Sequence, residues 1–244
     1  MPASSNITLS TATSEPLSLA GLPWPVELRI HPRARRLRLA LDEPRGLLRL
    51  TVPRRVSRRA ALDWAAQQSG WVEAQLARIE PAEPLAPGAT IPLDGQEVLL
   101  RWDEAAPRTP RLADGVLSCG GPAERFADRV ARWLRDEARR RLVEETRILS
   151  ARSGIADAPV SVGDAGTRWG SCSASGAIRY NWRLLLAPAY VRAYVVAHEV
   201  AHRVHLNHGA GFHALQSELY DGDVAGARLE LRRIGPRLKR VGRA

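Results

Sequence analysis

The stretch HEVAHRVHLNH, residues 198–208, decides how the rest of the chain is interpreted. His198 and His202 are four residues apart, so on a helix their imidazoles lie on one face and can bind one metal ion. Glu199 follows the first histidine, where its carboxylate can reach a metal-bound water without binding the metal. Apolar residues at 195–197 and 200–201 indicate a buried helix, in which polar side chains need partners. The stretch predicts a metal site with Glu199 as general base, although so short a match also arises by chance.

The third metal ligand is specified less directly. His205 lies seven residues after His198, roughly 10 Å along a helix, whereas zinc needs each ring nitrogen at about 2 Å. His208 can return to the metal if the helix ends just before Asn207 and this residue adopts the left-handed conformation. We therefore expect His208 as the third ligand, with a later acid such as Glu218 as the alternative. His205 is expected to cap the helix or to lie in the layer around the ligands.

The remaining chain alternates between strand and helix patterns. Alternation of apolar and polar residues from Val26 to Val52 predicts three strands of an antiparallel sheet with one solvent-facing side. Helical spacing and capping residues predict helices over 57–79, 122–154 and from 188 to about 206, a short helix around 212–219, and a last helix that ends at Gly235-Pro236. Hairpin turns are expected at 94–95, 114–115 and 173–176. These elements predict the α+β class.

Composition and charge limit the possible functions. A net charge of +10 is compatible with nucleic-acid binding, but Lys239 is the only lysine, and a codon bias towards arginine and alanine produces the same pattern. Since no DNA-binding module is recognised, any nucleic-acid partner is not expected to be bound sequence-specifically. No stretch approaches the roughly 20 apolar residues of a membrane helix, so no membrane partner is expected. Cys119 and Cys172 are expected to be free thiols, and the start lacks a targeting pattern, so we expect a cytoplasmic protein.

The same patterns divide the chain into four expected parts. Residues 1–22 are expected to form a disordered tail, and residues 23–120 a β-rich region with one helix. Residues 121–235 are expected to form the catalytic domain that carries the histidine stretch, and residues 236–244 a basic tail.

Three segments occur in a fixed order: TRWGSCSASGAIRYNWRLLLAP (167–188), HEVAHRVHLNH (198–208) and GFHAL (211–215). In these segments the chain resembles the YgjP-like metallopeptidase domain, a bacterial branch of the zincins that is distantly similar to SprT-type proteases. The resemblance extends from about residue 26 to about residue 223. It implies a zincin-like domain with zinc bound by His198, His202 and His208 and with Glu199 as base. His213 departs from the pattern, because the family usually has tryptophan after this phenylalanine.

The resemblance implies a zinc metallopeptidase that cleaves peptide or protein substrates by a zinc-activated water, with Glu199 as general base. Two alternatives stay open. The same metal site can hydrolyse a nucleoside triphosphate, although the chain has no glycine-rich phosphate loop. The protein can also be a DNA-associated protease of the SprT type.

The segment before the histidine helix is the candidate substrate-binding strand. An extended peptide can pair with the main chain of Arg168, Trp169, Gly170 and Ser171, where glycine permits a close approach. Ordinary strand packing is the simpler interpretation of these residues. Cys172 is a candidate for an additional metal ligand.

Overall fold

The computed structural model describes residues 15–78 and 81–243, and it divides the chain into two compact units, Met1–Glu80 and Pro81–Ala244. The expected boundary near residue 120 lies inside the second unit, because the strands before it share a hydrophobic core with the long helix after it. Most of the expected tail, residues 1–14, lies outside the described residues. The expectation of disorder is wrong for Leu17, which exchanges backbone hydrogen bonds of 2.9 and 2.7 Å with Val26.

The first unit contains a three-stranded sheet of β1 (Val26–His31), β2 (Arg38–Asp42) and β3 (Leu47–Pro53) in the order β1-β3-β2. β2 pairs antiparallel with β3, but β1 runs parallel to β3, so the expected antiparallel sheet is in fact mixed. Alternation of apolar residues specifies which side of a strand is buried, whereas strand direction depends on how the connections cross the sheet.

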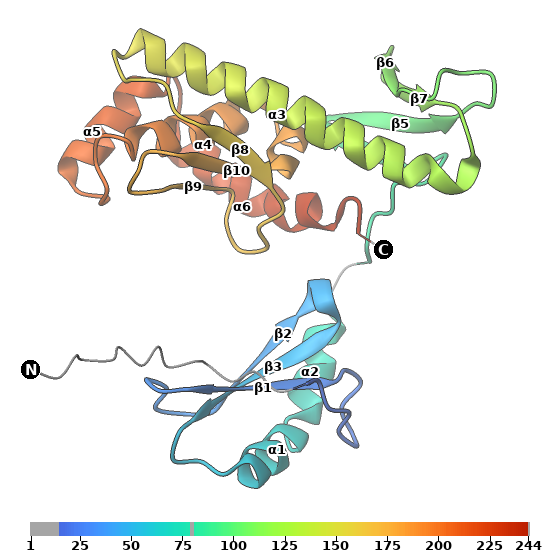
Figure 1. Ribbon diagram of the computed structural model, residues 1–244, viewed down its shortest axis with the longest axis vertical. Coiled ribbons are helices and arrows are strands. Elements are labelled where there is room, and N and C mark those ends of the chain that lie inside the picture. The colour runs from blue at the N-terminus through green and yellow to red at the C-terminus, as the bar shows by residue number, and fades with distance from the viewer. Residues whose placement is uncertain (1–14, 79–80, 244) are drawn as a thin grey trace, which may run out of the picture. The chain divides into compact units, whose positions relative to one another are not determined.

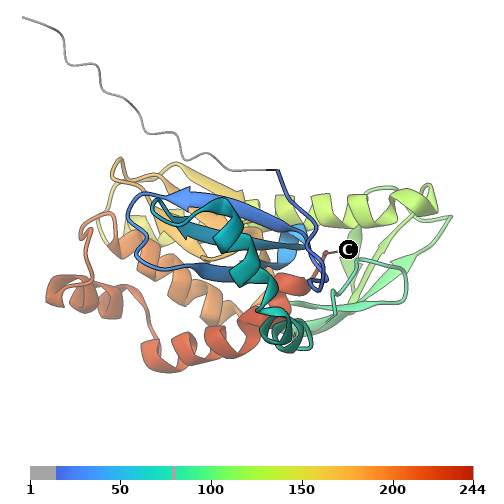
Figure 2. The same cartoon turned by 90° about the horizontal axis from the view of Figure 1, so that it is seen from below.

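Two helices, α1 (Arg58–Ala66) and α2 (Ser69–Leu76), stand where one was expected. Ser57 caps α1 as predicted, since its hydroxyl accepts a hydrogen bond of 3.2 Å from the Ala60 amide. Figure 2 shows both helices on one face of the sheet. Their apolar side chains and those of the strands form a core of their own, which includes Leu28, Leu48, Leu50, Ala61, Ala65 and Val72.

The second unit begins with a four-stranded sheet in the order β4-β5-β7-β6. Its strands are β4 (Thr90–Leu93), β5 (Gln96–Trp102), β6 (Arg111–Ala113) and β7 (Val116–Cys119). The predicted turns at Asp94-Gly95 and Asp114-Gly115 are confirmed, and all four residues have positive φ, as such hairpin turns require. The long helix α3 (Phe126–Arg152) follows and buries an apolar stripe against this unit's core.

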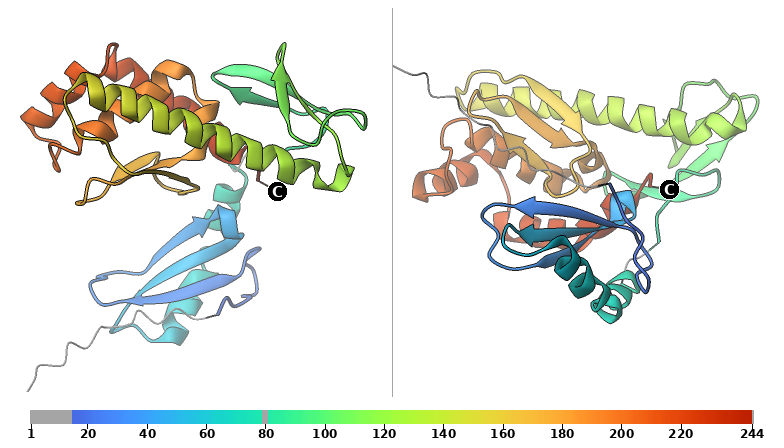
Figure 3. Two further views of the ribbon diagram at one scale, coloured as in Figure 1. Left: turned by 45° about the horizontal axis from the view of Figure 1, so that its top comes forward. Right: turned by 60° about the horizontal axis from the view of Figure 1, so that its bottom comes forward.

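A second, three-stranded sheet has the order β8-β10-β9, with β8 (Val160–Gly163), β9 (Gly170–Cys172) and β10 (Ile178–Asn181). β9 therefore lies at the edge of this sheet. Three helices complete the unit: α4 (Ala189–Ala201), α5 (Ala210–Leu219) and α6 (Val224–Arg240). In Figures 1 and 3 the β8–β10 sheet and α5 lie towards the end of α3 opposite to strands β5–β7, whereas α6 runs back towards those strands, and its Arg237 pairs with Glu97 of β5.

The last helix does not end at Gly235-Pro236 as expected but continues to Arg240, so most of the expected basic tail is helical. The apolar residues Leu231, Leu238 and Val241 are buried on both sides of the proline, and this burial offsets the one hydrogen bond that proline removes. The α+β class is confirmed. Among residues 15–78 and 81–243, no helix combines the length and apolar character that crossing a membrane requires.

A buried arginine fixes α4 within the second unit. Arg192 is 4% exposed and forms ion pairs with Asp94 in the β4–β5 turn and with Glu145 of α3, the latter at 2.8 Å. Arg141 of α3 also pairs with Asp94. Charged hydrogen bonds therefore connect α4, the helix that carries the histidines, to the β4–β5 turn and to α3. Such bonds are shorter and stronger than neutral ones.

Candidate metal centre

Three histidines converge at the end of α4. His198 lies in the last turn of α4, His202 caps the helix, and His208 comes from the loop before α5. One ring nitrogen from each lies within 4.8 Å of the others, and the Nε2 atoms of His198 and His208 are 3.3 Å apart. Imidazole nitrogens so close together have the arrangement of ligands around one metal ion.

His208 reaches this cluster by a different route from the expected one. α4 ends at Ala201, and single turns extend it as far as His205, whose amide bonds to the Ala201 carbonyl at 2.9 Å. Asn207 does not adopt the expected left-handed conformation. Its side-chain oxygen instead accepts a hydrogen bond of 3.2 Å from the Gly209 amide, and this local turn directs the chain into α5.

The ring of Phe212 in α5 packs against the rings of all three histidines. Its side chain is 1% exposed, and its ring centre lies 5.0 Å from that of His198, 4.6 Å from His202 and 4.7 Å from His208. The sequence indicated only that Phe212 belongs to a helix. Its contact with all three imidazoles follows from the packing of α5 against α4.

Hydrogen bonds around the cluster orient two of the rings. The Nδ1 atom of His202 lies 3.0 Å from the His205 carbonyl oxygen, to which it can only donate, so Nε2 is left with a free lone pair. The Nδ1 atom of His198 lies 3.2 Å from the side-chain amide nitrogen of Gln216, which is 3% exposed. A flip of this amide would bring its oxygen to Nδ1 and leave Nε2 of His198 free for a metal, and such outer partners strengthen metal binding. Gln216 was not indicated by any sequence pattern.

The other candidate ligands stay outside the cluster. His205 contributes its backbone carbonyl, as described, while its ring packs near Gly211. The ring of His213 lies 6.5 Å from that of His208. Among the described residues, the group of converging ligand atoms does not include His205 or His213. It does not include Cys172 or Glu218 either.

Burial favours the neutral form of His198 and His208, which is the form that binds metal. Burial and the three neighbouring histidines lower the pKa of His198 to about 4. Partial desolvation, followed by the charge of His202, also lowers the pKa of His208.

Glu199 is buried beside the cluster, on the side of strand β9. It is 4% exposed, and its Oε2 atom has no hydrogen-bond partner among the described residues. Burial raises the pKa of Glu199 to about 7, and the charge of Arg168 opposes part of this rise. An unpaired buried carboxylate oxygen is costly to maintain, which makes Glu199 a candidate for a functional role.

Strand β9 passes directly over Glu199. A methyl group at position 170 would lie 2.6 Å from Glu199 Cγ, closer than real carbon contacts, so any side chain here would force either β9 or the Glu199 side chain to move. From the sequence we expected Gly170 to permit a close approach of the substrate, and the structure shows that it permits a close approach of Glu199. The Trp169 ring packs near Gly235 of α6, with the Lys239 ammonium 5.2 Å from the ring centre.

The four residues expected to bind substrate line one small cavity of about 210 Å³. Arg168 and Trp169 precede β9, whereas Gly170 and Ser171 belong to it. β9 pairs with β10 along one side only, so its other side is a sheet edge within the described part of the chain. The arrangement leaves backbone groups available beside Glu199 and the histidines.

Comparison with known proteins agrees with this geometry. A family model described as YgjP-like, metallopeptidase domain, matches residues 35–233, and the expected resemblance is thereby confirmed. Neither the curated proteins nor the solved structures gave a match.

Proposed function

The chain belongs to the YgjP-like metallopeptidase domain family, and from this premise we propose that it cleaves peptide bonds at a zinc ion bound by His198, His202 and His208. The observation that supports this proposal best is the position of Glu199, a buried and partly unpaired carboxylate beside three converging imidazoles. A structural metal site has no need of such a group.

The donor set fits zinc. Catalytic zinc sites use three protein ligands and keep one position open, and imidazole nitrogens are preferred ligands of this ion. The lowered pKa values of His198 and His208 favour their neutral form, and two of the three histidines have hydrogen-bond partners outside the cluster. When bound, zinc would lower the pKa of a water molecule and polarise the scissile carbonyl.

Glu199 moves the proton in this proposal. Its carboxylate accepts a proton from the attacking water as the new C–O bond forms, and it returns this proton to the leaving nitrogen as the C–N bond breaks. The buried setting strengthens each of these interactions, because the local dielectric constant is low. Gly170 keeps β9 from displacing the carboxylate.

The edge of β9 holds the substrate in an extended conformation. A peptide that pairs with this edge forms main-chain hydrogen bonds and runs next to Glu199. Main-chain pairing is independent of side chains, so we expect broad sequence tolerance near the cleaved bond and selectivity from the small cavity lined by Arg168.

The test combines metal analysis with an activity screen. Purified protein is loaded with zinc and assayed on a mixed peptide library and, separately, on nucleoside triphosphates. We expect about one zinc per chain and peptide cleavage that Glu199→Gln lowers by about 10²- to 10⁴-fold at unchanged zinc content. Glu218→Gln is the matched control, because Glu218 is an exposed acid outside the cluster. Hydrolysis of triphosphates without peptide cleavage would contradict the proposal.

A further inference from the structure

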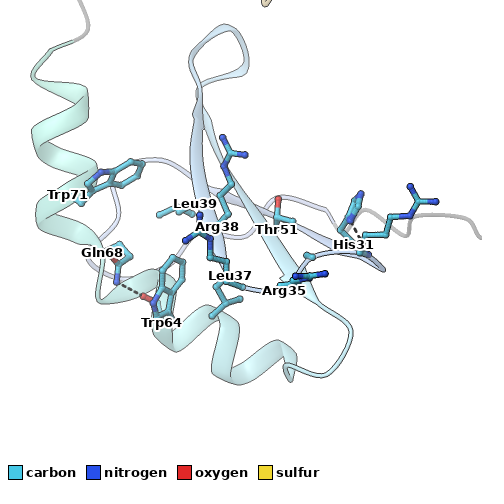
Figure 4. A pocket seen from close by; sticks show the side chains of 12 residues that line it. His31, Arg35, Leu37, Arg38, Leu39, Thr51, Trp64, Gln68 and Trp71 are labelled. Carbon is cyan, nitrogen blue, oxygen red and sulfur yellow. Dashed lines mark hydrogen bonds between the residues drawn. The ribbon is translucent and has the colours of Figure 1, made fainter.

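The first unit contains an open groove of about 950 Å³ that has no role in the proposed peptidase chemistry. One side is formed by the segment from His31 to Leu39, which leads into β2, and the other by α1 and α2 (Figure 4). Its lining combines four arginines with two tryptophans: Arg33, Arg35, Arg36, Arg38, Trp64 and Trp71. No aspartate or glutamate lines it.

These four arginines differ from others of the same unit. Arg45 pairs with Glu27 at 2.8 Å, and Arg49 pairs with Asp42, so both are neutralised. Within the described residues, none of the groove arginines forms an ion pair, and all four are exposed. Four unneutralised charges within six residues produce a local field that attracts a polyanion.

The tryptophans supply flat apolar surface next to this charge. Trp71 is 42% exposed, whereas its neighbour Val72 is fully buried in the core of the unit. Trp64 lies on the same wall, and its backbone carbonyl accepts a hydrogen bond of 3.3 Å from the Gln68 side chain. Trp64 is only partly exposed, whereas an exposed indole ring such as that of Trp71 beside arginines can stack on planar rings, a feature that helps single-stranded nucleic acids to bind.

We propose that this groove binds single-stranded nucleic acid, with bases on the tryptophans and phosphates on the arginines. A free nucleotide fits less well, because the arginines are spread along a segment and do not converge on one phosphate group. A duplex fits less well, because the arginines lie on a loop and strand and not on a helix that could enter a major groove. The stacking surface favours nucleic acid over an acidic peptide.

The binding experiment uses the full chain and fluorescence anisotropy of labelled 20-residue oligo(dT) and oligo(U). Four phosphate contacts on a single strand predict that log K falls with log salt concentration with a slope of about −2.8, which is about 50-fold between 50 and 200 mM salt. Tighter binding of a 20-base-pair duplex, or of a poly-glutamate peptide, than of the single strands would overturn the proposal.

Two charge variants of equal size locate the site. The variant that combines Arg33→Gln, Arg35→Gln, Arg36→Gln and Arg38→Gln is expected to lose most of the binding and most of the salt slope. The control variant combines Arg54→Gln, Arg55→Gln, Arg58→Gln and Arg59→Gln. It removes four exposed arginines of the same unit that do not line the groove, and it should preserve binding. Equal loss in both variants means that total charge and not the groove is responsible, which overturns the proposal.

Stacking is tested separately at the exposed tryptophan. Trp71→Ala is expected to weaken binding by about 5- to 140-fold, whereas Trp71→Phe keeps an aromatic ring and should retain most of the affinity. Unchanged affinity in Trp71→Ala would remove base stacking and with it the proposal. These measurements do not depend on hydrolysis, so their failure would leave the proposed peptidase function untouched.

Discussion

The absence of a side chain at Gly170 leaves the space that the Glu199 side chain occupies, and we expect the position of Glu199 to depend on it. In Gly170→Ala the new methyl group would lie 2.6 Å from Glu199 Cγ and closer still to Glu199 Oε1, whereas ordinary contacts begin at 3.4 Å, so one group must move by at least about 0.8 Å. Because β9 is paired to β10, we expect the carboxylate to move. Overpacking of this kind costs about 1–3 kcal/mol of folding free energy, and misplacing a catalytic group by about 1 Å costs about 10²-fold in rate.

The assay measures kcat/KM of zinc-loaded protein on a fluorogenic peptide, together with zinc content and Tm. We expect kcat/KM to fall about 100-fold in Gly170→Ala, with zinc retained because no histidine is displaced. Gly166→Ala is the control, since nothing lies within 4 Å of a methyl group there and its φ is not positive. Such a substitution usually raises stability slightly, by about 0.4–1 kcal/mol.

A double variant separates displacement of Glu199 from obstruction of the substrate. If Gly170 acts through Glu199, Gly170→Ala combined with Glu199→Gln should be no slower than Glu199→Gln alone, because both changes damage the same proton transfer. Multiplicative losses would show that the methyl group blocks the substrate instead. Undiminished kcat/KM in the single Gly170→Ala variant would refute the contact itself.

Three further predictions follow from the second unit. His208→Ala should lose zinc far more readily than His205→Ala, which keeps the backbone carbonyl that orients a ligand, and equal affinities in a chelator competition would contradict this. Gln216→Leu should weaken zinc binding by about 10- to 100-fold, whereas Gln216→Glu keeps a hydrogen-bond acceptor and should keep most of the affinity. Equal zinc dissociation constants in the two variants would exclude a role of Gln216 in orienting His198. Arg192→Ala should lower the free energy of unfolding by about 3 kcal/mol. This is towards the lower limit for a broken buried pair, because the partner carboxylates are about one-third exposed. A loss below about 1 kcal/mol in urea unfolding would show that the pairs contribute little.

The parts of the fold that could be predicted from the sequence are those in which neighbours along the chain decide the outcome. The Asp94-Gly95 turn is of this kind, because its geometry requires two residues that tolerate positive φ. The direction of β1 could not be predicted, since it depends on a pairing with β3 some 20 residues away. Pro236 predicted a helix end that burial of residues on both sides of it overrides.

The candidate site divides in the same way. His198, Glu199 and His202 are related by one helical turn, so their common location follows from spacing alone. His208 was expected near them, but the proposed left-handed Asn207 was wrong, because a side-chain hydrogen bond to Gly209 makes the turn instead. Gln216 and Phe212 could not be predicted as contacts of His198, because they lie on another helix and a local sequence pattern does not show how two helices pack.

Helix α5 determines how the third ligand is held. His208 is exposed and comes from a loop, so on its own it would sample many orientations. Phe212 restricts the His208 ring by contact and touches both α4 histidines, and Gln216 orients His198. Phe212 and Gln216 are four residues apart and therefore share one face of α5. Since the same face contacts the loop histidine and a helix histidine, we expect small shifts of α5 against α4 to change the arrangement of all three histidines and with it the affinity for a metal.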